Sequence, residues 1–161
     1  MINCNCAEDR RIEGTVLMET NGIIAVANCA DGTHDGNCTF IASQNLNVRN
    51  LLVSFDETSV GSPARVRPCS AGGLPIGVAT DEVEAGQAVN VHFLGGGETV
   101  SMVAAEPIDP GAVLVASDGG KVEEFADEGE VHLVGIAIGS AISAGDRFEV
   151  LPHVSVPLSM E

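Results

Sequence analysis

The 161-residue chain contains no tryptophan and no tyrosine, and only 5 of its residues are phenylalanine. Its 7 lysine and arginine residues face 23 aspartate and glutamate residues, which gives a formal charge of −16. Nucleic-acid binding needs cations that neutralise phosphates and aromatic rings on which bases stack, so this composition argues against a nucleic-acid partner. A net negative charge of this size is also repelled by an anionic membrane surface.

Long hydrophobic runs are absent as well. No stretch of about 18 uninterrupted apolar residues occurs, so the sequence offers no candidate membrane-spanning helix. The N-terminus, MINCNCAEDRR, lacks a basic region followed by an apolar run, and we expect no secretory signal. Hydrophobic residues nevertheless make up 45% of the chain, which is too many for a disordered acidic tail. The composition therefore predicts a soluble, acidic, globular protein.

The charge is unevenly distributed. Residues 1–37 carry six acids and two arginines, and residues 75–161 carry fifteen acids, one lysine and one arginine. The segment between them, residues 38–74, carries two acids and three arginines, namely Arg49, Arg65 and Arg67. This segment, with a net charge of +1, is the part of the chain that would favour an acidic partner. The simpler interpretation, that each arginine is merely solvated at a strand edge, stays open.

Most apolar runs are four to eight residues long, are rich in Val, Ile or Thr, and end at Gly, Pro, Asn or Asp, which is typical of β-strands. Strands are expected at residues 15–18, 22–27, 39–42, 48–54, 64–68, 76–80, 88–94, 99–104, 112–116, 121–124, 131–138 and 147–151. We predict an all-β fold, with a compact barrel-like or β-tulip-like domain of short strands at residues 38–152. Residues 1–37 would form an N-terminal arm or hairpin, and residues 153–161 a C-terminal tail.

A short motif occurs three times, at residues 83–91, 108–116 and 142–150. Each copy has an apolar residue, a polar residue, Ala or Pro, and Gly, followed by apolar residues three and five positions after the Gly. Ala or Pro before Gly suits a type II β-turn, in which Gly supplies the positive φ. Residues 77–79 (GVA) precede the first copy much as residues 135–137 (GIA) precede the third. Because the spacing varies, the motif predicts similar turn-and-strand units rather than a solenoid.

No catalytic residues are predicted. Nucleophilic catalysis needs Ser or Cys beside His and an orienting acid, and the histidines lie in no such motif: His34, His92, His132 and His153. Gly95-Gly96-Gly97 is not a phosphate-binding loop, since no Lys-Ser/Thr follows it and no helix begins there. We therefore expect a protein that is not an enzyme.

The cysteines leave three alternatives open. Four of the five lie in the first 38 residues, with His34 between the last two: Cys4, Cys6, Cys29 and Cys38, while Cys69 stands alone. Thiolates in this number could hold a tetrahedral zinc ion, but Cys-x-Cys is tighter than the usual zinc knuckle and no second knuckle is present. Without a secretory signal, free thiols are the first expectation, with a disulfide or zinc as alternatives. Neither a metal nor another cofactor is predicted.

One segment resembles part of an enzyme family. Ala144-Gly145-Asp146-Arg147-Phe148 resembles the Gly-Asp-Arg segment of trimeric dUTP pyrophosphatases, which are all-β and of similar length. Those enzymes also have a sugar-stacking Tyr and a Gly-rich C-terminal arm. This chain has no Tyr, and residues 152–161 contain no Gly. A dUTP pyrophosphatase-like nucleotide hydrolase is therefore only the alternative function.

A second resemblance covers roughly residues 38–152. Seven segments carry it in order: LPIGVATDE at 74–82, AGQAVNV at 85–91, TVSMV at 99–103, IDPG at 108–111, SDGGKV at 117–122, VGIA at 134–137 and AGDRFEV at 144–150. This order and spacing resemble the small capsid decoration, or cement, proteins of tailed bacteriophages. Residues 1–37 depart from the family pattern.

The resemblance implies a non-enzymatic virion structural protein. Such proteins bind the outside of the expanded phage head as symmetric oligomers, often trimers, and stabilise the lattice of the major capsid protein. The implied partners are the major capsid protein and further copies of the chain, with no nucleic acid and no membrane. The implied location is the capsid exterior, after assembly in the host cytoplasm. A phage head-fibre base or another virion protein would share these features.

The charge distribution suggests where such a capsid contact would lie. We predict that the N-terminal arm and residues 38–74 form the contact surface, with Arg49, Arg65 and Arg67 as contact residues.

Overall fold

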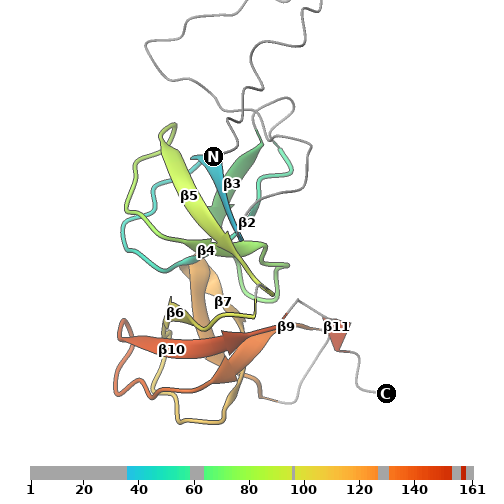
Figure 1. Ribbon diagram of the computed structural model, residues 1–161, viewed down its shortest axis with the longest axis vertical. Helices are drawn as coiled ribbons and strands as arrows, with labels where there is room; N and C mark the ends of the chain where they lie inside the picture. Colours follow the sequence, from blue (N-terminus) through green and yellow to red (C-terminus); the bar gives the residue numbers. More distant parts are fainter. Residues whose placement is uncertain (1–35, 59–63, 96, 127–130, 154–156, 159–161) are drawn as a thin grey trace, which may run out of the picture.

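The computed structural model describes residues 36–58, 64–95, 97–126, 131–153 and 157–158. These residues form strands and one short 3₁₀ helix, and they include no α-helix (Figure 1). Within the same residues, no helix is long and apolar enough to cross a membrane. The predicted all-β class is confirmed.

The first five strands form a closed barrel. They are β1 (Asn37–Ala42), β2 (Leu52–Phe55), β3 (Arg65–Pro68), β4 (Gly77–Ala79) and β5 (Ala88–Phe93). Their order around the barrel is β1-β3-β2-β4-β5, and β5 closes it by pairing with β1. The β1–β3 pair is parallel and the others are antiparallel. Apolar side chains such as Phe40, Val53, Val66 and Val89 fill the interior because they alternate with outward-facing residues along the strands.

The next five strands form a second sheet, which lies below the barrel in Figure 1. They are β6 (Val100–Val103), β7 (Val113–Ser117), β8 (Lys121–Glu124), β9 (Val131–Ala137) and β10 (Arg147–Pro152). The strand order is β6-β10-β9-β7-β8, and the 3₁₀ helix η1 (Asp118–Gly120) connects β7 to β8. A short strand, β11 (Pro157–Leu158), pairs with β9.

The second sheet repeats the strand pairing of the barrel. Its order β6-β10-β9-β7-β8 corresponds to β1-β5-β4-β2-β3, which is the barrel order read from β1 in the other direction. In the barrel, the parallel pair of β1 and β3 includes Ala42 and Val66. At the equivalent place in the second sheet, a parallel bridge joins Ala104, which follows β6, to Val122 of β8. The chain therefore contains two copies of one five-stranded arrangement, which we call the first unit (β1–β5) and the second unit (β6–β10).

The three repeated turns adopt the predicted conformation. The φ angle is +89° at Gly86, +91° at Gly111 and +92° at Gly145. In each turn the residue after the Gly donates its N–H to the carbonyl three residues earlier, as a β-turn requires. In each turn the Gly N–H also donates to the carbonyl of an alanine: Ala42, Ala137 and Ala104, respectively. The repeat found in the sequence is thus a repeat in structure.

A fourth copy of this turn was missed in the sequence. Asn50 has a φ of +68° and donates its N–H to the Ala79 carbonyl at 2.8 Å, just as Gly111 donates to Ala137. The sequence signal was absent because Asn replaces Gly and the loop is one residue longer. Asn is among the few residues other than Gly that visit left-handed backbone conformations routinely.

We expect Asn50→Ala to lower the free energy of unfolding by about 1 kcal/mol, because a Cβ without a compensating polar group is disfavoured at positive φ. Asn50→Gly should change it by less than about half that amount, since Gly tolerates this φ but adds entropy to the unfolded chain. Urea unfolding followed by far-UV circular dichroism measures both variants. An equal loss for Ala and Gly would contradict this explanation of the turn.

The two units share one apolar core. Leu52 and Val78 of the first unit lie in the same buried cluster as Met102, Leu114 and Phe148 of the second unit. Backbone contacts reinforce this internal interface. The Gly120 N–H donates to the Cys69 carbonyl at 2.8 Å, and the Ala71 N–H donates to the Asp118 carboxylate at 3.0 Å. The two units are therefore packed together rather than merely tethered.

The expected strands agree with the structure at most positions. The strand expected at 48–54 begins only at Leu52, because the turn through Asn50 occupies its first part. Strand β11 was not predicted. The strands expected at 15–18 and 22–27 lie outside the described residues, as does most of the predicted N-terminal arm.

Candidate functional site

Two of the three candidate arginines lie together on β3. Arg65 and Arg67 alternate with the buried Val66, so both belong to the outer face of the barrel. Arg65 is paired with Ile41 of β1, and Arg67 with Ser54 of β2. Arg65 is exposed and Arg67 is half-buried. The outer surface of β3 thus carries two cations on neighbouring outward positions, which we call the β3 face.

Arg67 lies near an anion of its own chain. The Asp56 carboxylate accepts hydrogen bonds from the Thr58 N–H at 3.1 Å and from the Thr58 hydroxyl at 2.7 Å. These bonds hold the pKa of Asp56 below its usual range, with smaller contributions from Ser43 and from the positive charge of Arg67. Asp56 therefore stays ionised and partly balances Arg67. Arg65 is the more accessible of the two cations for a partner.

Arg49 lies apart from the β3 face. It is in the turn that precedes β2, where the next residue, Asn50, is hydrogen-bonded to Ala79. The backbone carbonyl of Arg65, by contrast, accepts the Asp56 N–H at 2.9 Å, just beyond the last residue of β2. Arg49 and Arg65 therefore lie near opposite ends of β2. The structure brings together Arg65 and Arg67 but not Arg49.

The cysteines of the described residues lie in separate cores. Cys38 belongs to the cluster inside the barrel and Cys69 to the cluster shared by the two units. Burial raises the pKa of the Cys69 thiol, so the neutral thiol predominates at neutral pH. The other members of the cysteine-rich segment, Cys4, Cys6, Cys29 and His34, lie outside the described residues. Where the structure describes the chain, no three His, Cys, Asp or Glu side chains are grouped to hold a metal ion.

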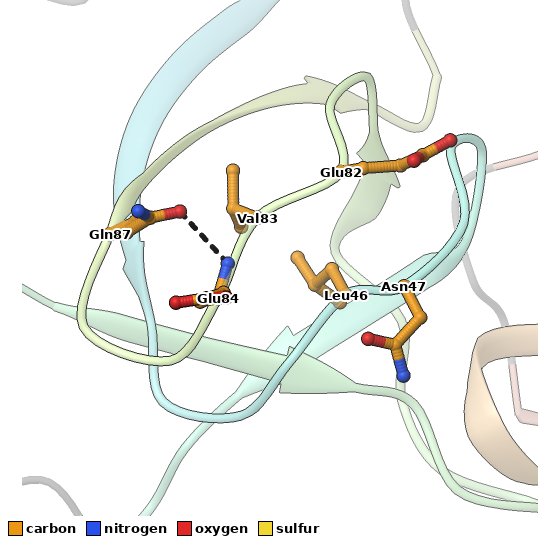
Figure 2. A pocket seen from close by; sticks show the side chains of 6 residues that line it. All are labelled: Leu46, Asn47, Glu82, Val83, Glu84 and Gln87. Atoms are coloured by element: carbon orange, nitrogen blue, oxygen red, sulfur yellow. Dashed lines mark hydrogen bonds between the residues drawn. The ribbon is translucent and has the colours of Figure 1, made fainter.

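A shallow depression of about 370 Å³ lies beside the first type II turn (Figure 2). Six residues line it: Leu46, Asn47, Glu82, Val83, Glu84 and Gln87. One of its polar side chains belongs to the turn itself, since the Gln87 side-chain oxygen accepts the Glu84 N–H at 2.9 Å. Its two carboxylates would repel an anionic substrate such as a nucleotide. The depression is an open, acidic surface feature.

The segment that resembles the dUTP pyrophosphatase motif is used structurally. The Asp146 carboxylate accepts the N–H groups of Ile142 at 3.0 Å and Ser143 at 2.9 Å, and so closes the third type II turn. Arg147 begins β10 and pairs with Val103 of β6. This aspartate therefore already has a role in holding the turn.

Two comparisons with known proteins gave matches, one to a family by sequence and one to a solved structure. The chain matches the sequence model of phage cement proteins over residues 50–152, which covers β2 to β10. Among solved structures it is similar to the head fiber gp8.5 N base of bacteriophage phi29, with a TM-score of 0.61 and 18% identity, over 74% of this chain and 94% of that chain. At this identity the structural likeness shows the fold alone. No curated protein matches the chain.

Proposed function

The chain belongs to the phage cement protein family, and from this premise we propose that it binds the outside of the expanded phage head as a symmetric oligomer and stabilises the lattice of the major capsid protein. It is a virion structural protein of the capsid. The family match over residues 50–152 is the observation that carries the proposal.

Mass action supplies the mechanism. A protein that binds the expanded lattice, but not the unexpanded or disrupted one, stabilises the expanded lattice by its binding free energy. A symmetric oligomer contacts several capsid subunits at once, so individually weak contacts add as avidity. Such a role needs an accessible contact surface and a rigid fold, and it needs no chemical step. The shared core of the two units supports the required rigidity.

The site geometry favours this structural role over the dUTP pyrophosphatase alternative. The depression beside the first turn is shallow and acidic, and Asp146 of the Gly-Asp-Arg segment closes a turn. The family match points in the same direction. We expect no pyrophosphate release when the purified protein is incubated with dUTP and Mg²⁺.

The β3 face is our candidate for the capsid contact. Arg65 is exposed on a strand whose other outward cation is Arg67, in a chain with a formal charge of −16. On the rest of the protein surface, an acidic capsid surface would meet mostly carboxylates. Electrostatic repulsion between the protein and such a capsid surface is therefore weakest at the β3 face. Because Arg65 is exposed to solvent, attachment should weaken as the salt concentration rises.

Replacing Arg65 and Arg67 together with Ser should lower the apparent affinity for expanded heads roughly tenfold, because two charge contacts are lost in every bound copy. Undecorated expanded heads of the phage that encodes the chain are mixed with purified protein, and occupancy is measured by cosedimentation and imaging. Arg147→Ser is the matched control, since Arg147 is an exposed arginine of the second unit.

Two outcomes would contradict different statements. Absence of wild-type protein from expanded heads would overturn the proposed function. Normal occupancy by the Arg65/Arg67 variant, or an equal loss with Arg147→Ser, would overturn only the assignment of the β3 face. Thermal unfolding of each variant checks that the fold is intact.

A further inference from the structure

The internal interface buries one specific part of the first unit. Leu52 of β2 and Val78 of β4 are cross-strand partners, and the Cys69 N–H donates to the Leu52 carbonyl at 2.9 Å. Leu52 and Cys69 are 0% exposed and Val78 is 2% exposed, and all three lie in the shared core cluster. The second unit therefore covers an apolar part of the outer face of the first unit, made by these three residues.

The second unit carries the same arrangement on its own outer face. By strand pairing, the counterparts of Leu52, Cys69 and Val78 are Val113, Phe125 and Ile136. Val113 and Ile136 are cross-strand partners, and the Phe125 N–H donates to the Val113 carbonyl at 2.8 Å. All three counterparts are apolar, although the described part of the chain provides no third unit to cover them.

These side chains are partly exposed. Ile136 is 37% exposed, and its cross-strand partners Val113 and Leu151 are each 38% exposed. The three form a continuous row across β7, β9 and β10, which we call the apolar row. Large contiguous patches of exposed apolar surface mark interaction sites in folded proteins, whereas apolar residues scattered singly do not.

The other half of the internal interface also has a counterpart, which lies in the first unit. The second unit meets the first through the end of β7, where Ala116 is 1% exposed and accepts the Gly72 N–H at 3.1 Å. Ala116 pairs with Val122 as Phe55 pairs with Val66, so Phe55 is the counterpart of Ala116 in the first unit. Phe55 is 46% exposed.

We propose that copies of the chain join head to tail, with the apolar row of one copy packed against the barrel end around Phe55 of the next. This contact repeats between chains the internal interface that already joins the two units within one chain. A second copy fits as the occupant because it carries a counterpart of the surface that covers Leu52 and Val78. A contact between two different surfaces is heterologous and closes into a ring when the rotation permits. The proposed function includes a symmetric oligomer, and the head-to-tail contact specifies how its subunits meet. In this one respect the inference rests on the proposed function.

The first test measures mass in solution. Full-length protein, without heads, is measured by size-exclusion chromatography with light scattering. The wild type is expected well above the 16.5 kDa of one chain, and Ile136→Lys and Phe55→Lys should each raise the dissociation constant roughly 30-fold or more and yield monomers. Ile142→Lys is the matched control, because Ile142 is 84% exposed and lies outside the row, and it should leave the mass unchanged.

The second test mixes the two Lys variants. Each mixed pair retains one intact row and one intact barrel end, so the mixture should form dimers although each variant alone is monomeric. A monomeric wild type, unchanged mass in both variants, or loss of the oligomer in Ile136→Lys but not in Phe55→Lys would overturn the head-to-tail contact. Far-UV circular dichroism checks folding, and Leu151→Lys and Phe55→Thr replace any variant that fails to fold. Because no heads are present, failure here is distinguishable from failure of capsid binding.

Discussion

Replacing Gly120 with alanine should destabilise the protein by at least about 2 kcal/mol more than the same change at the adjacent Gly119. Both glycines have positive φ, +72° at Gly119 and +76° at Gly120, so both substitutions incur the same backbone cost of roughly 1–2 kcal/mol. Only Gly120 has no space for a side chain. A Cβ there would lie 2.5 Å from the Leu52 carbonyl oxygen and 3.0 Å from the Leu51 Cβ, whereas at Gly119 nothing lies within 4 Å.

The clash at Gly120 falls on the internal interface. The Gly120 N–H donates to the Cys69 carbonyl at 2.8 Å, so a shift that relieves the clash also strains this contact between the units. Urea unfolding, followed by far-UV circular dichroism because the chain has no Trp or Tyr, gives the free energy of unfolding for both variants. Equal losses at the two positions would show that η1 does not lie against β2 as described.

Local features of the fold were accessible from the sequence. The strands were predictable because each is a short apolar run ended by a turn residue, as at β8, whose predicted and observed bounds both are 121–124. The type II turns were predictable because Gly86, Gly111 and Gly145 each stand where a positive φ is needed. Each of these features depends on a few consecutive residues, so the local sequence is enough to predict it.

The duplication of the five-stranded arrangement was only partly visible. Two GxA segments hinted at it, but other equivalent positions hold chemically different residues. Asn50 stands where the second unit has Gly111, and Phe55 where it has Ala116. Equivalence here is a matter of strand pairing and backbone hydrogen bonds, which join residues far apart in the chain. A single sequence does not record which strands pair.

The candidate site, too, was only partly predictable from the sequence. Counting charges identified the arginines of residues 38–74, because composition needs no tertiary structure. Whether they form one surface depends on where β2 begins and ends, and this places Arg49 near one end and Arg65 near the other. The Gly-Asp-Arg segment was ambiguous for a related reason. A carboxylate that closes a turn and one that binds a substrate can have the same neighbours in sequence, and Asp146 does the former.

The second large effect is expected at Gly77 and Gly135, which occupy the same position in the two units. Gly77 of β4 is paired with Phe93 of β5, and Gly135 of β9 with Pro152 of β10. A Cβ at Gly77 would overlap the His92 carbonyl oxygen, and a Cβ at Gly135 would overlap the Leu151 carbonyl oxygen. Both obstacles are backbone atoms of a paired strand, so neither can turn aside as a flexible side chain can.

Gly77→Ala and Gly135→Ala should therefore each lower the free energy of unfolding by roughly 3 kcal/mol, since the paired strands must separate to admit the methyl group. Gly86→Ala is the control: its φ of +89° makes alanine unfavourable, but nothing lies within 4 Å, so about 1–2 kcal/mol is expected. Urea unfolding by circular dichroism compares the three variants.

The form of the transition is as informative as its midpoint. Because Leu52 and Val78 of the first unit share a core with Leu114 of the second, damage to either unit exposes the apolar surface of the other. Both variants should then unfold in a single transition, with similar losses although the substitutions lie in different units. Two separate transitions would show that the units unfold independently. A large loss of stability in Gly77→Ala with little or none in Gly135→Ala would contradict the equivalence of the two units. It would also remove the structural basis for a head-to-tail contact between chains.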